Sequence, residues 1–301
     1  MVLHLFVLLL WCAGALHGFL AAATSVTCSK ESVAAATALG VQQINLKQKH
    51  GYKFRLQEVQ GSKYQAVSGG CHIDVNVMLV QTTCHFTNPK PAEECGLWAK
   101  WDMGAVASCS IELWVLWRVA KVVKYQCTTR QEFTNAELVR TCPDCSGLLP
   151  LDDPTALQAV SEAVLKFNRE NRYQNDFILM EVDHVQSVYY PRAFSRTLVQ
   201  FALVETNCPR GAQTFAPCMP RCPDVATHAF CKTIYDNHEQ KLEELECEVY
   251  RPKNPTRHLT DMPEPECKLF HNTPEAWICK DRLKNPEPSI HHICPFPLAL
   301  Y

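Results

Sequence analysis

The feature that most constrains this chain is an internal repeat with a period of about 123 residues. Residues 41–45 align with 164–168, and residues 56–59 align with 179–182, both at an offset of 123. Four cysteines recur at offsets between 120 and 124, namely Cys84 with Cys208, Cys95 with Cys218, Cys109 with Cys231 and Cys127 with Cys247. A helix-to-strand junction and four cysteines repeated together predict two copies of one module.

The N-terminus and the cysteine count indicate a secreted, extracellular protein. Residues 2–23 carry no Lys, Arg, Asp or Glu, and they end in three alanines at 21–23. This pattern is typical of a signal peptide, with a membrane anchor as the alternative. The chain has 17 cysteines, so removal of Cys12 with residues 1–23 leaves an even number, as expected for a disulfide framework in an oxidising compartment.

Because the cysteines repeat with the modules, their positions predict the local pairs Cys84–Cys95, Cys109–Cys127, Cys208–Cys218 and Cys231–Cys247. Apolar residues at helical spacing predict helices over 32–47 and 156–168. The helices are followed by alternating runs, in which Ile73, Val75, Val77 and Leu79 share one face, whereas residues 198–204 are apolar on both faces.

The predicted fold class is therefore α+β, with one helix packed on an antiparallel sheet in each module. The expected organisation is a signal peptide (1–23), a first module (24–141), a linker (142–146), a second module (147–250) and a poorly structured tail (251–301) that is rich in proline.

The helix, the hairpin and the two consecutive disulfides of each module resemble the cystatins. Two such modules joined by Cys142-Pro143-Asp144-Cys145 resemble the fetuin family within that superfamily. Further matching elements are residues 82–85 (TTCH), residues 125–128 (YQCT) and the late Cys294-Pro295. Within the family, three features favour the fetuin-B branch, namely the linker with Thr141, residues 166–171 and the Cys95-Gly96 junction. The chain departs from the glycosylated habit of fetuins, since it has no N-x-S/T sequon.

The resemblance implies further disulfides. It implies a bridge from Cys28 to Cys294 and a small ring Cys142–Cys145. Four cysteines exceed the family pattern; among them Cys267–Cys279 is a reasonable local pair, which leaves Cys71 with Cys222.

The resemblance also implies a function, which is inhibition of secreted zinc metalloproteases of astacin type. Asp144, held outward by Cys142, Pro143 and Cys145, would displace water from the catalytic zinc. The second-module hairpin would flank it in the cleft, through residues Gln186, Ser187, Val188, Tyr189 and Tyr190. A plain interdomain staple is the alternative for the linker, as is strand packing for the hairpin, and Ser146 stands where the family usually has a second proline.

A second hypothesis is inhibition of papain-like cysteine proteases, because the first module has the cystatin Q-x-V-x-G hairpin motif. The motif residues are Gln65, Val67 and Gly69, and Trp117 lies near the second-hairpin tryptophan of cystatins. The glycine of the cystatin N-terminal wedge is absent, because residues 28–30 (CSK) occupy its place. Gly69 also suits an ordinary hairpin turn.

Other classes have less support in the sequence. A plasma carrier or mineral-binding protein of fetuin-A type would need rows of carboxylates, and the corresponding strand offers Asp74 alone. No catalytic motif or phosphate-binding loop is present, so we expect no enzyme activity. With a net charge of -2, neither nucleic acid nor membrane is an expected partner, and no cofactor or resident metal is expected. Metal or redox chemistry at Cys142 and Cys145 does not suit a secreted chain.

Overall fold

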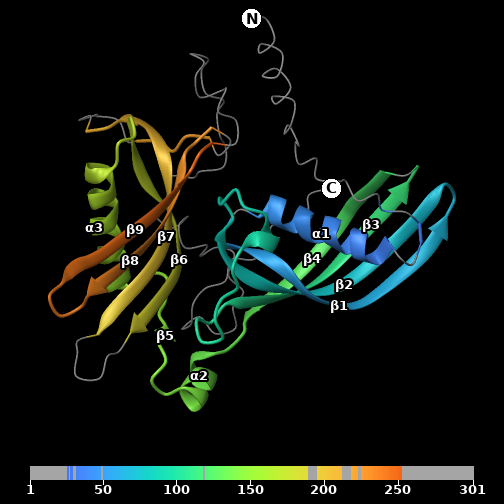
Figure 1. Cartoon of the computed structure of the whole chain (residues 1–301), viewed down its shortest axis with the longest axis horizontal. Coiled ribbons are helices and arrows are strands. Elements are labelled where there is room, and N and C mark those ends of the chain that lie inside the picture. The colour runs from blue at the N-terminus through green and yellow to red at the C-terminus, as the bar shows by residue number, and fades with distance from the viewer. Residues whose placement is uncertain are drawn as a thin grey trace, which may run out of the picture.

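The computed structural model consists of two domains side by side, each formed by one helix and one antiparallel sheet (Figure 1). Almost all of the expected tail and the expected signal peptide lie outside the described residues. In the part of the chain that is described, no helix is long and apolar enough to cross a membrane. The described residues are Val26, 28–29, 32–48, 50–117, 119–188, 195–211, 218–222 and 225–252.

The first module packs one helix across a four-stranded sheet. Helix α1 spans Val33–Lys47, and the strands in sheet order are β1 (Tyr52–Val67), β2 (Gly70–His85), β3 (Ala105–Leu116) and β4 (Val119–Gln131). The predicted alternation in β2 is confirmed, because Ile73, Val75, Val77 and Leu79 are at most 1% exposed. These side chains meet Ala36 and Ile44 of α1 in one apolar core.

The second module repeats this plan. Helix α3 spans Pro154–Glu170, and the strands in sheet order are β5 (Gly147–Leu148), β6 (Asn175–Val188), β7 (Arg196–Pro209), β8 (His228–Asp236) and β9 (Lys241–Tyr250). Asp153 begins α3 by accepting hydrogen bonds from Thr155 N and Ala156 N, both at 3.0 Å. Such N-caps satisfy amides that lack helical partners.

Strand β7 is buried on both faces, as its sequence predicted. Phe201 faces the helix side and belongs to the core of the second module. Ala202 faces the other way and packs with Tyr52 of the first module and with Phe230. One face of the second sheet therefore covers the first module, and this contact explains the apolar residues on both sides of β7.

Five local disulfides are confirmed, four of them predicted from the repeat and one, Cys142–Cys145, implied by the family resemblance. They are Cys84–Cys95, Cys109–Cys127, Cys142–Cys145, Cys208–Cys218 and Cys231–Cys247. Cys267–Cys279 lies outside the described residues.

The expected bridge from Cys28 to Cys294 is wrong, because Cys28 bonds to Cys71 with a Cα–Cα distance of 5.6 Å. The pairing of Cys71 with Cys222 is wrong for the same reason. Cys71 is fully buried at the start of β2, and the N-terminal segment crosses the β1–β2 hairpin there, where Tyr64 Oη donates to the Cys28 carbonyl at 3.1 Å.

Candidate functional site

The linker is preceded by the short helix α2 (Asn135–Thr141), which follows the end of β4 between the two domains (Figure 1). Thr134 and Glu137 form a capping box, with Glu137 N donating to Thr134 Oγ1 at 3.2 Å and Thr134 N donating to the Glu137 carboxylate at 2.8 Å. The hydrogen bonds that the Glu137 carboxylate accepts from Thr134 N and from Thr134 Oγ1 lower the pKa of Glu137. The box fixes the start of a helix that is too short to be stable alone.

The linker ring, Cys142 to Cys145, follows α2 directly. Cys142 N donates to Leu138 O at 2.7 Å, and Cys145 N donates to Cys142 O at 3.0 Å, so the ring is also a hydrogen-bonded turn. Both cysteines pack against a small cluster of Met103, Leu138 and Leu148. Pro143 and Asp144 remain exposed at the ring's outer edge. The ring therefore presents a carboxylate on an anchored, conformationally restricted turn.

Hydrogen bonds also join the residues before the ring to the residues after it. Asn135 Nδ2 donates to Leu148 O, and Leu148 N donates to Asn135 Oδ1, both at 3.0 Å. Leu148 is itself part of β5, which pairs with β6 through Gly147 with Ser187 and Leu148 with Gln186. The linker ring thus lies two residues before a strand that is bonded to the second-module hairpin.

The structure brings this hairpin beside the ring, although not every predicted residue is available to a partner. Gln186 is buried, Ser187 is half-buried, and Val188 ends β6. Tyr189 and Tyr190 lie outside the described residues. An exposed contact from this hairpin would therefore begin at Ser187 rather than at Gln186.

The first-module hairpins lie at the other end of their sheet. Gly70 pairs with Leu116 at that end, whereas Ala105 pairs with Gln131 at the end next to α2. The 13 residues of β4 separate the two ends by about 40 Å at the usual rise of a strand. The predicted residues Gln65, Val67, Gly69 and Trp117 therefore form no common site with Asp144.

At this distal end the two hairpin turns meet. Gly69 has φ +79°, a left-handed conformation that favours glycine, and its carbonyl accepts from Trp117 N at 3.3 Å. A Cβ added at Gly69 would lie 3.4 Å from the Trp117 ring. Trp117 is 83% exposed, and the Cys28–Cys71 bridge holds the N-terminal segment nearby.

The sequence analysis missed two clusters of titratable side chains. On the first sheet, Asp74 is joined by His72 and Glu112, with His72 Nε2 2.9 Å from Glu112 Oε1. Between the modules, Glu181 and Asp183 of β6 meet His85 of β2. The only signal for the second cluster was a run of charged residues inside an otherwise apolar strand.

Burial governs the titration of the interdomain groups. It raises the pKa of Asp183 well above its usual range, and the charge of Glu181 adds to this effect. Burial alone would also raise the pKa of Glu181, but hydrogen bonds with His50 and His85 outweigh it and hold that pKa well below its usual range. Burial lowers the pKa of His184 to about 4, so this imidazole is neutral at physiological pH.

Comparison with known proteins gives consistent relatives in sequence and in fold. Alpha-2-HS-glycoprotein (fetuin-A) of Pan troglodytes is 28% identical over 243 residues, covering 79% of this chain and 63% of the relative. Fetuin-B of Homo sapiens is 25% identical over 264 residues, covering 82% and 67%. The chain thus spans about two thirds of the length of these relatives. No protein-family model matches the chain.

Among solved structures, mouse fetuin-B in its inhibitory complex with human meprin beta has a TM-score of 0.61 at 19% identity, covering 90% of this chain and 92% of that one. Mouse fetuin-B in complex with crayfish astacin has a TM-score of 0.59 at 22% identity, covering 74% and 72%. These matches show two cystatin-like domains. In sequence and in fold, the chain is thus similar to the fetuins. Relatives of both fetuin-A and fetuin-B type align at similar identity, so assignment to the fetuin-B branch stays a prediction.

Proposed function

We propose that this fetuin-like protein is a secreted inhibitor of astacin-type zinc metalloendopeptidases and that Asp144 is the residue directed at the catalytic zinc. The observation that carries the proposal is the exposed Asp144 on a disulfide-closed turn between the two domains. The ring is held by the Cys142–Cys145 bond, by packing on Leu138 and Leu148, and by the hydrogen bonds of Asn135.

The chemistry of a catalytic zinc suits such a group. A catalytic zinc has three protein ligands and one coordination position open to water, and carboxylate oxygen is a normal zinc ligand. A carboxylate on a restricted turn loses little conformational entropy when it takes that position, so more of the interaction energy contributes to affinity. The hairpin that β5 joins to the linker would then contact the protease beside the zinc.

Two further observations support the proposal. Mouse fetuin-B, which shares the fold, is known in complexes with astacin and with meprin beta. The disulfide framework agrees with secretion, because such bonds persist in oxidising compartments. The protein would act as an inhibitor and not as an enzyme.

The test is the inhibition constant of Asp144→Ala against an astacin-family protease. We expect at least a ~100-fold loss, about 2.7 kcal/mol of binding free energy, because the zinc-directed oxygen is removed. Glu170→Ala, which removes another exposed acid from the end of α3, is the matched control and should leave inhibition unchanged. Equal inhibition constants for Asp144→Ala and the parent would mean that the ring is only a structural link between the domains.

A second candidate function, inhibition of papain-like proteases, is favoured by one observation at the distal end. There, exposed Trp117 stands against Gly69, and the two hairpins and the N-terminal segment meet. Titration of papain with the parent and with Gly69→Trp tests it, because a bulky side chain at this turn would block insertion into a cleft. A weak parent activity that the substitution does not alter would remove this candidate.

A further inference from the structure

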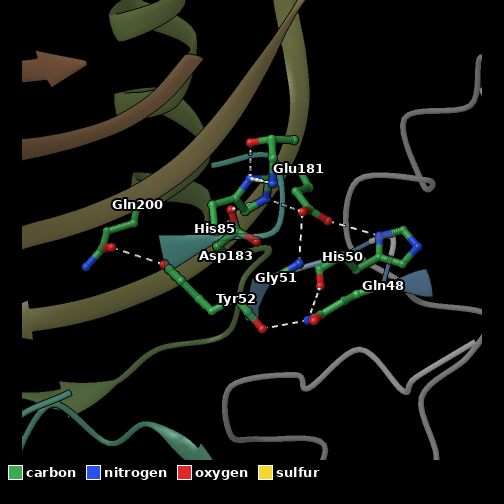
Figure 2. Close-up of polar contacts among 9 residues, drawn as sticks. Gln48, His50, Gly51, Tyr52, His85, Glu181, Asp183 and Gln200 are labelled. Carbon is green, nitrogen blue, oxygen red and sulfur yellow. Dashed lines mark hydrogen bonds and ion pairs between the residues drawn. The ribbon is translucent and has the colours of Figure 1, made fainter. Parts of the chain in front are cut away.

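The contact between the two modules contains a buried cluster of one histidine and two carboxylates (Figure 2). The His85 side chain is 0% exposed, and those of Glu181 and Asp183 are 3% and 2% exposed. His85 Nε2 lies 2.6 Å from Glu181 Oε1 and 3.6 Å from Asp183 Oδ2. The three potential ligand atoms all lie within 4.8 Å of one another, although they come from two different domains.

The two carboxylates differ in how their oxygens are satisfied. Glu181 Oε2 lies 3.0 Å from His50 Nδ1, and Glu181 Oε1 accepts from Gly51 N at 2.9 Å. Asp183 Oδ2 has no hydrogen-bond partner within the described part of the chain. A buried oxygen without a partner is costly, and this one points into the cluster beside His85 (Figure 2).

We propose that the cluster is a binding site for a divalent cation of the zinc class, with His85 Nε2, Glu181 and Asp183 as its ligands. One imidazole nitrogen and carboxylate oxygens form a normal ligand set for zinc. A doubly charged ion balances the two buried carboxylates and supplies the missing partner of Asp183. Separations of about 3.4 Å are expected between ligands of a tetrahedral zinc, so Glu181 Oε1 moves slightly away from the ring.

The surroundings orient the ligands as metal sites require. The Phe230 ring stacks on the His85 ring, with centroids 5.2 Å apart. In the ion-free structure His85 Nδ1 accepts from Thr87 N at 3.3 Å, and Nε2 donates to Glu181 Oε1. A metal on Nε2 requires the proton to move to Nδ1, where Thr87 Oγ1 at 2.6 Å is placed to accept it. Second-shell partners of this kind fix the tautomer and the orientation of a ligating histidine.

Room for a water molecule exists next to Asp183. A cavity of about 30 Å³ is lined by Asp183, His50 and Gln48, and this volume accommodates a water molecule. Gln48 Oε1 is buried there without a hydrogen-bond partner in the described chain and is available to accept from that water. The site therefore offers three protein ligands, with room for water on the side of Asp183 that faces away from His85 and Glu181, which do not line this cavity. The bound ion would join the two modules.

The test is titration of Zn²⁺ into the untagged, chelator-treated full chain, followed by calorimetry. We expect one saturable site, and Asp183→Asn should weaken its affinity at least about tenfold because one charged ligand is lost while the shape is kept. His72→Gln is the matched control. It disrupts the other His/Asp/Glu cluster, on the first sheet, and should leave the affinity unchanged.

Two results would overturn the proposal: no saturable binding, or an affinity that responds to His72→Gln and not to Asp183→Asn. X-ray absorption of the zinc-loaded parent keeps the test independent of how the variant folds. One imidazole with oxygen ligands is expected, whereas two or more imidazoles would place the ion elsewhere among the 12 histidines. Neither measurement depends on protease inhibition, so the outcome is separate from the role of Asp144.

Discussion

The two modules can be compared with each other, because the chain builds the same architecture twice from different residues. In the first, Asn45 Nδ2 donates to Phe54 O at 2.7 Å and Asn45 Oδ1 accepts from Phe54 N at 2.8 Å. In the second, 123 residues later, Asn168 makes the same pair of bonds to Phe177, at 2.8 and 2.9 Å. What differs between the copies is therefore open to change within this fold, and what recurs is required by it.

Three differences are informative. Cys28–Cys71 fastens the N-terminal segment to the first module only. Gln81 Oε1 accepts from Ala105 N at 3.0 Å, whereas at the equivalent place in the second module the carboxylate of Glu205 accepts from Thr227 N at 3.0 Å. Finally, α1 has Gly40 where α3 has Ala163. Each difference predicts a change that affects one module and spares the other.

The largest effect is expected from removal of the Cys28–Cys71 bridge by the double substitution Cys28→Ser and Cys71→Ala. The bridge spans a sequence separation of 43 residues, for which the chain-entropy relation gives about 4 kcal/mol. Hydrogen exchange followed by mass spectrometry should show faster opening of β2 and β3, with β7 and β8 unchanged. Equal acceleration in both sheets would mean that the modules unfold as one unit.

That bridge also marks a limit of sequence reasoning. The repeat predicted both helices, the alternation in β2 and the four local pairs, because these depend on short spacings that occur twice. The partner of Cys28 depends on where the N-terminal segment crosses the sheet, and a family pattern supplied the wrong cysteine. The meeting of His85 with Glu181 was out of reach as well, since a repeat says nothing about how its two copies face each other.

For the candidate site, the resemblance to the fetuins implied the Cys142–Cys145 ring, and the structure contains this disulfide with Asp144 exposed. Given the ring, an outward Asp144 was expected because a four-residue disulfide loop has few conformations. The sequence did not predict that β5 would pair with the end of β6 and bring one hairpin to the ring. Nor did it place Gly69 and Trp117 at the opposite end of the first sheet. These placements depend on strand pairing across the linker, which no local motif encodes.

The second prediction concerns the recurring asparagines. Asn45→Ala and Asn168→Ala should each destabilise their own module by about 2–3 kcal/mol, because two hydrogen bonds are lost and a strand N–H and C=O lose their partners. Hydrogen exchange in increasing urea, followed separately in each module, would report both losses of unfolding free energy. Asn→Asp, which keeps the acceptor and loses the donor, is the control and should cost less. A large effect at one asparagine alone would break the equivalence of the modules.

The third prediction is a pH dependence confined to the second module. Burial alone would raise the pKa of Glu205, but hydrogen bonds from Thr227 and Asn175 and the nearby Arg221 outweigh it and lower the pKa. The folded pKa thus lies below the unfolded value of about 4.3. The contribution of Glu205 is present above pH ~4.3 and is lost as the pH falls through the folded pKa.

Glu205→Gln should therefore reduce the loss of stability between pH 7 and pH 3 by about 1 kcal/mol, the difference between hydrogen bonds to a charged and to a neutral acceptor. The measurement is the unfolding free energy of the second module at several pH values. Gln81→Glu is the reciprocal change and should introduce the same dependence into the first module. An unchanged pH profile in both variants would contradict this assignment.

The smallest effect is expected at the contact between α1 and its sheet. A Cβ at Gly40 would lie 2.9 Å from both Cδ1 and Cγ2 of Ile111, closer than packed carbons allow. Gly40→Ala gains about 1 kcal/mol of helix propensity, but overpacking costs about 1–3 kcal/mol, so a net loss of about 1 kcal/mol is expected. The second module combines Ala163 with Thr233 at the position equivalent to Ile111, a smaller residue without a δ carbon.

The helix position and the strand position, Gly40 and Ile111, should therefore be coupled. Ile111→Val alone costs about 0.5–1.5 kcal/mol through lost packing. Combined with Gly40→Ala, it should cost about 0.5–1 kcal/mol less than the sum, because removal of Cδ1 opens space for the new methyl group. Strictly additive free energies in this double-mutant cycle would mean that the helix shifts as a whole and that the glycine does not set its distance from the sheet.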